Sequence, residues 1–300
     1  MLQMAIISLT SIPPRFAGLR PVLEQLQRQT ETIDEIRLYI PKRYRRFPDY
    51  DGRLPDVPKG VNVVRVEDDL GPASKFLHAA RDLEGEDLQI LFCDDDRIYS
   101  RHWARGLLSA QRQRPGDCVA CYGAHLHEII PGTPVVGEGP RAVAGRHLPD
   151  PVFRMKRYAQ RLKWWRPTPV GDKAQRRYVV RAGYTDIAFG YSGVVIRPEF
   201  IGPDFEIPDD VWMVDDILIS GHLARRGIGI WLPRRVEHCS RTTTEKIDPL
   251  RAASFEGDNR RASDRRAIDH FRKTYGIWQN TAPSAVERVG EEPADAATDP

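Results

Sequence analysis

The fold expected for this chain rests on the stretch Asp87-Leu-Gln-Ile-Leu-Phe-Cys-Asp-Asp-Asp96. Its apolar centre has the length of a buried strand, and the acids Asp94, Asp95 and Asp96 follow at the C-terminal end. Ligands of open α/β sheets bind at this end of the strands. Clustered carboxylates suit Mg²⁺ or Mn²⁺, which keep water ligands and bridge to substrate phosphates. The other interpretation is a solvated acidic turn that caps the next helix.

Strand and helix signals alternate on both sides of this stretch. The other predicted strands cover residues 4–10, 36–40, 61–66, 117–122, 187–196 and 228–232. The predicted helices contain Leu19 to Leu26, open at Gly71, cover 102–112, and run from Asp215 to Gly227. The alternation predicts an α/β fold in which a mostly parallel sheet has helices on both faces.

Length and composition predict a single large core. The chain has 300 residues, of which 41% are hydrophobic, and we expect one domain over 1–280. The acidic, apolar-poor end at 281–300 predicts a disordered tail. No apolar run approaches the roughly 20 residues of a spanning helix. The N-terminus has no basic leader and is expected to form the first strand.

The four cysteines indicate a reducing, cytoplasmic location, because they are too few and too scattered for a disulfide framework. Cys118-Val-Ala-Cys121 has the spacing of zinc and redox sites but lacks a second pair. Buried thiols on a strand are therefore the preferred interpretation.

Two further segments suit a phosphorylated ligand. Gly71-Pro-Ala-Ser-Lys75 places a cation and backbone N–H groups at a helix start, where anions are favoured. It is not a Walker A sequence, and a solvated lysine is the alternative. Thr10, Ser11 and Arg15 follow the first strand, where small hydroxyls let a nucleotide approach the backbone. Ordinary turn chemistry is the alternative there.

A second acidic group and one histidine complete the candidates. Asp215 and Asp216 open a helix, either as partners of its dipole or with one of them as a general base. The dipole keeps such a base ionised but weakens it, so burial or the neighbouring carboxylate has to offset this effect. His238 follows the last strand and is either a third metal ligand or a satisfied polar residue.

The segment 154–181 contains ten basic residues and two adjacent tryptophans. It is interpreted as a lid over a phosphorylated donor, as a surface that contacts anionic lipid, or as a solvated flap. Basic and aromatic side chains also bind single-stranded nucleic acid, but no RNA-binding motif is present. The net charge of +3 is modest, and no nucleic-acid partner is expected.

Taken in order, these segments resemble a GT-A-fold glycosyltransferase, similar to the family 2 enzymes. The resemblance covers roughly residues 4 to 240 and is carried by Ile6–Arg15, Asp69–Lys75, Asp94–Asp96, Gly190–Gly193, and Val214–Asp216 with Gly227. It implies that Asp94 and Asp96 hold Mn²⁺ or Mg²⁺ against the donor diphosphate, with His238 as a further ligand. It also implies that Gly190–Gly193 shapes the acceptor side. Asp215-Asp216 stands where the family carries Glu-Asp, so Asp216 is the expected base and Asp215 its neighbour.

The resemblance implies a Rossmann-like GT-A sheet with a donor half at 1–115 and an elaborated acceptor half at 116–280. One sugar would pass from a nucleoside-diphosphate sugar to a hydroxyl of a glycan, lipid-linked or small-molecule acceptor, with inversion. The expected donor-binding residues are Thr10, Ser11, Arg15, Asp69, Lys75, Asp94 and Asp95.

Two departures from the family pattern refine the expectation. Pro41-Lys-Arg43 replaces the acid that reads the base, so Asp68 or Asp69 is expected to serve. The Gln-x-x-Arg-Trp motif of processive synthases is absent, which favours transfer of a single sugar.

The competing hypotheses are a Mg²⁺-dependent phosphohydrolase or nucleotidyltransferase, and a non-catalytic nucleotide-sugar-binding protein. The lipid interpretation of 154–181 adds peripheral contact at the inner face of the cell membrane.

Overall fold

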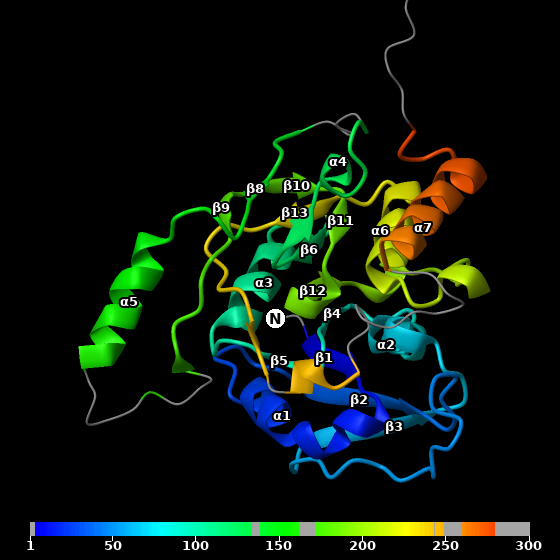
Figure 1. Ribbon diagram of the computed structural model, residues 1–300, viewed down its shortest axis with the longest axis horizontal. Helices are drawn as coiled ribbons and strands as arrows, with labels where there is room; N and C mark the ends of the chain where they lie inside the picture. Colours follow the sequence, from blue (N-terminus) through cyan, green and yellow to red (C-terminus); the bar gives the residue numbers. More distant parts are fainter. Residues whose placement is uncertain are drawn as a thin grey trace, which may run out of the picture.

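Eight strands form one twisted sheet in the order β10-β13-β6-β12-β4-β1-β2-β3 (Figure 1). The computed structural model describes residues 4–133, 139–162, 168, 172–242, 244–248 and 260–279. The strands of this sheet are β1 (Met4–Thr10), β2 (Glu35–Pro41), β3 (Val61–Val66), β4 (Leu88–Phe92), β6 (Cys118–Ala120), β10 (Gly183–Thr185), β12 (Val194–Ile196) and β13 (Ile230–Leu232).

Six of the eight strands run in one direction. The pairs β1–β2, β2–β3, β1–β4 and β6–β13 are parallel. β12 is antiparallel to both β4 and β6, and β10 is antiparallel to β13. The predicted α/β class with a mostly parallel sheet is therefore confirmed.

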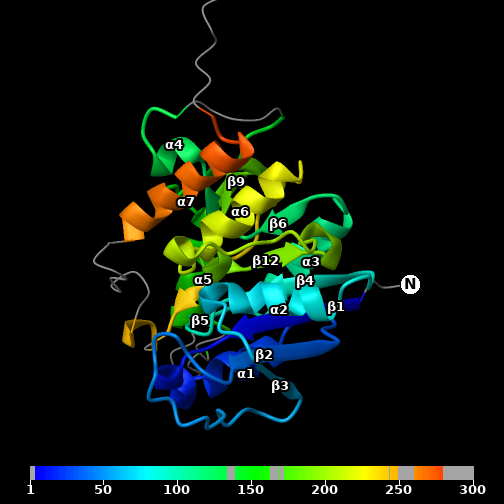
Figure 2. The ribbon, with the colours of Figure 1, turned by 90° about the vertical axis from the view of Figure 1, so that its right-hand side faces the viewer.

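Helices cover both faces of the sheet. On one face lie α1 (Arg20–Gln27) and α3 (Trp103–Arg112), and on the other lie α2 (Ser74–Asp82), α6 (Asp215–Arg225) and α7 (Arg260–Tyr275). Successive residues of β1 alternate between the faces, because side chains of a strand have a period of two. Ile7 and Leu9 join the core under α1 and α3, whereas Ile6 joins the opposite core. Figure 2 views the molecule from the side of α2, α6 and α7.

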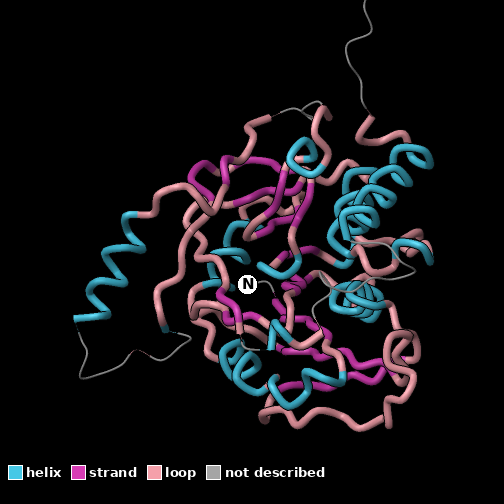
Figure 3. Tube along the Cα trace, in the orientation of Figure 1, coloured by secondary structure: helices cyan, strands magenta, loops and turns pink. Residues whose placement is uncertain are grey.

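The remaining elements are short and lie around the sheet (Figure 3). Three two-stranded ladders pair β5 (Arg97–Ile98) with β14 (Ser240–Arg241), β7 (Gly123–Ala124) with β11 (Ile187–Ala188), and β8 (Val143–Ala144) with β9 (Val179–Arg181). The other helices are α4 (Leu126–Ile129), α5 (Pro151–Leu162) and the 3-10 turns Pro13–Gly18, Gly71–Ala73, Gly190–Ser192, Pro198–Phe200, Asp209–Val211 and Thr244–Lys246.

The prediction of one strand over 187–196 was wrong. β11 ends at Ala188, a 3-10 turn follows, and β12 begins at Val194 in a different sheet. The break lies at Gly193, whose φ of +103° is rarely adopted by residues with a side chain. A Cβ there would also lie 2.2 Å from the ring of Trp103. The chain therefore changes sheets within what looked like one apolar run.

Three α-helices were not predicted. The first is the short α4, in a region expected to be irregular. α5 overlaps the start of the basic segment 154–181, has no buried residue, and stands away from the sheet at the left of Figure 1. α7 is mostly polar and packs on α6 through Phe271, which lies against Gly221. The two adjacent tryptophans of the basic segment and the predicted tail at 281–300 lie outside the described residues.

Two smaller expectations have clear outcomes. All four cysteines are buried free thiols, which confirms the interpretation of Cys118 and Cys121 as core residues. Among the residues that the structure describes, no helix combines the length and the apolar character needed to cross a bilayer.

Candidate active site

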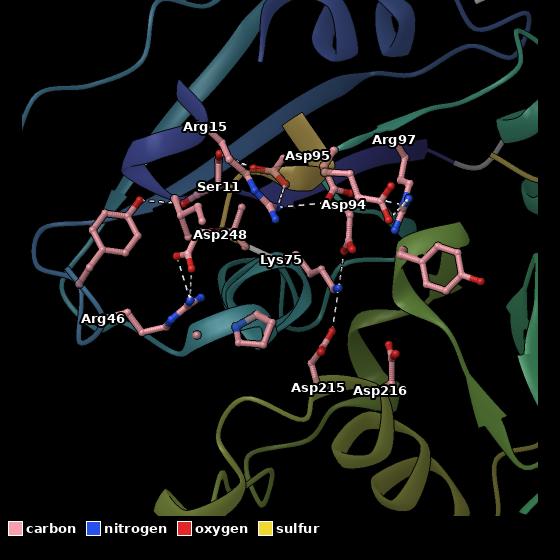
Figure 4. A pocket seen from close by; sticks show the side chains of 18 of the residues that line it. Ser11, Arg15, Arg46, Lys75, Asp94, Asp95, Arg97, Asp215, Asp216 and Asp248 are labelled. Carbon is pink, nitrogen blue, oxygen red and sulfur yellow. Dashed lines mark hydrogen bonds and ion pairs between the residues drawn. The ribbon is translucent and has the colours of Figure 1, made fainter. Parts of the chain in front are cut away.

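A cavity of about 360 Å³ lies at the C-terminal edge of β1 and β4. Chain connections diverge between these strands, since β2 and β3 extend the sheet beyond β1 and β12 lies beyond β4. Such a point is where α/β sheets bind ligands. The predicted residues in the wall of this acid-lined cavity are Thr10, Ser11, Arg15, Asp69, Lys75, Asp94, Asp95, Asp96, Asp215 and Asp216. Figure 4 labels Ser11, Arg15, Lys75, Asp94, Asp95, Asp215 and Asp216 among them.

Asp95 joins the segments that follow β1 and β4. Ser11 Oγ donates to one carboxylate oxygen of Asp95 at 2.5 Å, and Arg15 Nη1 donates to the other at 2.7 Å. Arg15 Nε also donates to the carbonyl of Ile247 at 3.0 Å. Asp95 and Arg15 are both buried. They were predicted to contact the donor, but in the structure their charges are engaged with each other.

The carboxylates of Asp94 and Asp96 accept fewer hydrogen bonds than that of Asp95. The side chain of Asp94 is 28% exposed, and one of its oxygens accepts a hydrogen bond from Lys75. Asp96 Oδ2 lies 3.2 Å from Arg15 Nη1, and its buried Oδ1 makes no hydrogen bond but lies 3.3 Å from Arg97 Nε. Burial and the negative charges of Asp94 and Asp95 raise the pKa of Asp96 to about 6. The three carboxylates therefore repel one another, although Lys75, Arg15 and Arg97 each form an ion pair with the group.

These two carboxylates fit a divalent cation. Eight acidic and six basic side chains line the cavity, which leaves an excess of two negative charges. Within the described part of the chain, no group of three or more His, Cys, Asp or Glu side chains converges as a ready-made metal site. Mg²⁺ commonly binds one or two carboxylates and takes its other ligands from water and substrate phosphates. Asp96 Oδ1, which makes no hydrogen bond, and the partly exposed carboxylate of Asp94 match that mode.

Lys75 connects the two acidic groups (Figure 4). Its Nζ lies 2.6 Å from Asp94 Oδ1 and 2.7 Å from Asp215 Oδ2. Burial lowers the pKa of Lys75, but attraction to Asp215, Asp94 and Asp216 outweighs burial and raises it, so the ammonium stays charged. Lys75 was predicted to be a diphosphate ligand in the first turn of a helix. It does open α2, but it is 4% exposed and already has two carboxylate partners.

Asp215 and Asp216 are the first two residues of α6 and are both buried. Asp216 Oδ1 accepts a hydrogen bond from the backbone N–H of Gly190 at 2.8 Å. Gly190 lies close to both groups, since a Cβ at this position would lie 2.8 Å from Lys75 Nζ and 3.2 Å from Asp216 Oδ1. The segment Gly190–Gly193 thus lies against the second acidic group.

Asp69 and Thr10 border the cavity with their polar groups engaged. The carboxylate of Asp69 accepts backbone hydrogen bonds from Gly71 at 2.9 Å and Arg45 at 2.7 Å, so it fixes the loop before α2. Thr10 Oγ1 donates to the carbonyl of Tyr39. Asp68, the alternative to Asp69 for reading a base, is not part of the cavity wall.

Several wall residues were not predicted. The clearest are Tyr44, Arg46, Phe47, Arg97, Trp212, Glu245 and Asp248. Arg46 Nη2 donates to both carboxylate oxygens of Asp248, at 2.8 and 2.9 Å, and joins segments far apart in the sequence. Arg97 directly follows the three aspartates, so its place in the sequence could have identified it as a residue of the cavity wall. Nothing in the sequence indicated the pair of Arg46 and Asp248.

His238 lies in an adjoining cavity, which we call the basic cavity, and not in the wall of the acid-lined one. Its Nδ1 lies 2.8 Å from the carbonyl of Cys239, and its Nε2 is buried without a hydrogen-bond partner. Burial lowers the pKa of His238 to about 4, so the ring is neutral. The structure therefore does not bring His238 together with Asp94 and Asp96, and its role as a metal ligand has no support in this geometry.

The arrangement places two acidic groups in one cavity with a buried cation between them. One side can hold a cation and phosphate oxygens, and the other can accept a proton from a hydroxyl. Neither a scan against protein-family models nor a search of curated proteins found a match to this chain.

Proposed function

We propose that the protein is a GT-A-type glycosyltransferase that uses Mn²⁺ or Mg²⁺ and moves one sugar, with inversion, from a nucleoside-diphosphate sugar to an acceptor hydroxyl. The proposal rests on one observation: Asp94 and Asp96 share a cavity with Asp215 and Asp216, and Lys75 joins the two groups.

The donor would bind on the side of Asp94 and Asp96. These carboxylates would hold the cation, which when bound neutralises charge on the leaving diphosphate. The contacts of Asp95 with Ser11 and Arg15 fix the position of the neighbouring acids. Aromatic side chains of the same wall, from Tyr44 and Phe47, offer an apolar surface for the nucleoside.

The acceptor hydroxyl would react on the side of Asp216. Its oxygen forms a bond to the anomeric carbon while the bond from that carbon to the diphosphate oxygen breaks. The electron pair leaves with the nucleoside diphosphate, and the hydroxyl proton passes to the Asp216 carboxylate. Lys75 already donates to Asp215, whereas the N–H of Gly190 orients Asp216, which favours Asp216 as the base. A single displacement of this kind inverts the anomeric configuration.

The test is incubation with a panel of nucleotide sugars, Mn²⁺ and mixed sugar acceptors, followed by mass spectrometry and NMR of the products. Glycosyl transfer with inverted configuration is expected. Cleavage of the donor to a nucleoside monophosphate and a sugar 1-phosphate would indicate a phosphohydrolase. Release of pyrophosphate in a parallel incubation with a nucleoside triphosphate and a sugar 1-phosphate would indicate a nucleotidyltransferase. Binding of a nucleotide sugar without any turnover would indicate a non-catalytic binding protein. Each of these three results contradicts the proposal.

A further inference from the structure

The basic cavity opens beside the acid-lined one and has the opposite charge. Its volume is about 410 Å³, and it shares Arg97, Arg146, Tyr191 and Arg241 with its neighbour. The charged residues of its wall are all basic: Arg97, Arg146, Arg157, Lys173, Arg176 and Arg241. No acidic side chain lines it in the described structure.

Four of these cations have no acidic partner. Arg97 and Arg241 form ion pairs with Glu245, so part of their charge is compensated. Among the described residues, the wall cations that form no ion pair to an acid are Arg146, Arg157, Lys173 and Arg176. Like charges in one cavity repel one another unless a counter-ion is present. An anionic ligand would supply that counter-ion, and arginine is well suited to hold phosphate or carboxylate.

His238 adds a hydrogen-bond acceptor to the same wall. Because its Nδ1 contacts a carbonyl oxygen, Nδ1 carries the proton and Nε2 presents a lone pair. That atom is buried without a partner in a side chain only 4% exposed, and buried polar atoms are normally satisfied. The rings of Tyr178 and Tyr191 lie 4.3 and 5.5 Å from the imidazole, between centroids, and also line the cavity. A hydroxyl donor with an apolar ring face matches this wall.

We propose that the basic cavity binds the acceptor, and that this acceptor carries a phosphate or carboxylate group in addition to the hydroxyl that receives the sugar. The term acceptor rests on the proposed glycosyltransferase function, whereas the anion site does not. The shared wall places an occupant of the basic cavity next to the cavity that contains Asp216.

The test is calorimetric titration of the full chain with glucose 6-phosphate, glucuronate and glucose, each with and without UDP and Mn²⁺. Decyl phosphate and decyl glucoside form a second arm that separates a lipid-borne anion from a soluble one. We expect each anionic probe to bind about tenfold more tightly than its neutral counterpart, since charge-assisted hydrogen bonds are the stronger kind. UDP with Mn²⁺ should not displace it.

The variant Arg157→Gln with Lys173→Gln should lose this preference. The variant Arg28→Gln with Arg43→Gln is the matched control, because it removes the same charge from exposed positions outside both cavities. Equal affinity for anionic and neutral probes, or full affinity in the first variant, would overturn the proposal. Displacement of the anion by UDP with Mn²⁺ would do so too, because it would place the probe in the acid-lined cavity.

The two proposals fail in different ways. Anion binding with these properties, but without transfer from any nucleotide sugar, would keep the basic site and refute the glycosyltransferase. Transfer to neutral acceptors alone, with no anion preference in the titration, would keep the glycosyltransferase and refute the anionic acceptor.

A separate observation concerns the outer side of α5. Met155, Tyr158 and Leu162 follow helical spacing and are 66%, 66% and 55% exposed, so they form an apolar stripe that faces solvent. The helix contains four basic residues and no acidic one. Its inner side is half-buried, through Phe153 and Arg157, which line the basic cavity. An apolar stripe beside basic side chains is the pattern of helices that lie on anionic bilayers.

We infer that α5 docks on an anionic lipid surface. The test is flotation with vesicles of phosphatidylcholine alone or mixed with phosphatidylglycerol. Wild type should float only with the mixed vesicles, and less as salt rises. Met155→Ser with Leu162→Ser, and Arg154→Gln with Arg161→Gln, should each reduce flotation severalfold, whereas the Arg28→Gln, Arg43→Gln control should not. Absence of flotation, or flotation unchanged in both test variants, would overturn the inference. A dimer that Met155→Ser with Leu162→Ser dissociates would likewise overturn it in favour of a second copy.

Discussion

The acid-lined and basic cavities share a wall but differ in charge and in how the chain builds them. The first has an excess of negative charge and is formed mainly by segments that follow β1, β2 and β4 and by the start of α6. The second has only basic charges and is formed by α5 and by loops that surround the sheet. The difference shows that the sheet fixes the chemistry of one cavity, whereas added segments fix the chemistry of the other.

One of the arginines in the wall that the two cavities share is Arg97. Arg97 contacts Asp96 on the acid-lined side and Glu245 beside it, and its guanidinium lies over the ring of Tyr191. Burial alone would lower the pKa of Arg97, but Asp96 and the other anionic neighbours raise it, so the guanidinium remains charged. A fixed cation therefore stands where the two cavities meet.

The largest expected effect comes from breaking the link inside the acid-lined cavity. Lys75→Met should destabilise the fold by about 3–5 kcal/mol, because it leaves Asp94 and Asp215 with an uncompensated buried charge. Urea unfolding measures the loss. The control Lys42→Met removes an exposed ion pair with Glu67 and should cost at most about 1 kcal/mol. Adding Asp215→Asn to Lys75→Met should recover part of the stability. Equal losses for Lys75→Met and Lys42→Met would show that Lys75 does not join the two acidic groups.

The next largest effect is expected on turnover, from replacing the proposed base in the acid-lined cavity. Asp216→Asn should lower turnover about 100-fold or more, the usual scale for loss of a general base, and leave donor affinity nearly unchanged. Steady-state kinetics with the nucleotide sugar found in the product screen provides the measurement. Asp209→Asn is the control, since that side chain is 90% exposed and lies outside both cavities. Normal turnover in Asp216→Asn would remove the proposed base.

A smaller effect is expected on the basic side. His238→Phe keeps an aromatic ring but removes the free acceptor atom, so the acceptor KM should rise about fivefold, as expected for one hydrogen bond of about 1 kcal/mol. The donor KM should not change, and His238→Gln should restore part of the acceptor affinity. A rise in the donor KM, or lost response to Mn²⁺, would instead assign His238 to the acid-lined cavity.

The last prediction concerns the pH dependence of stability and is independent of the chemistry of both cavities. His222 lies outside both cavities, and burial lowers its pKa from 6.5 to about 4. Between these values the unfolded chain binds a proton that the folded chain does not, so the free energy of unfolding falls as pH falls through this window. His222→Gln should flatten that slope in urea unfolding at a series of pH values, and His147→Gln at an exposed position should not. An unchanged slope in His222→Gln would assign the pH response to other groups.

The sequence predicted the sheet better than the segments around it. The strands β1 to β4 and the helices α1 to α3 have local apolar patterns of sufficient length, and all were predicted close to their observed bounds. α5 was missed because its segment lacks a clear core pattern: none of its residues is buried, and Met155, Tyr158 and Leu162 face solvent. The break at Gly193 was missed because it depends on the ring of Trp103, which packs there from a distant helix.

In the candidate site too, local patterns were predicted from the sequence, whereas contacts between distant segments were not. Strand-end acids and the acids of α6 were predicted from order along the chain, and the structure brings them into one cavity. The distinct roles of Asp94 and Asp95 depend on Ser11 and Arg15, and no pattern in the sequence separates the two acids. Lys75 was expected to contact a diphosphate from the first turn of a helix, with a solvated lysine as the alternative, and neither expectation places it between two acidic groups. Its burial follows from the second acidic group, which lies 140 residues further along the chain.

The most direct measurement is calorimetric titration of UDP and GDP into the full chain with Mn²⁺ or with a chelator. The central claim is that Asp94 and Asp96 bind a cation together with a nucleoside diphosphate. We predict that at least one nucleotide binds only with Mn²⁺, and that Asp94→Asn and Asp96→Asn abolish this binding while Asp209→Asn keeps it. Binding that is equally strong in the chelator, binding that survives in both site variants, or no binding of either nucleotide would contradict the claim.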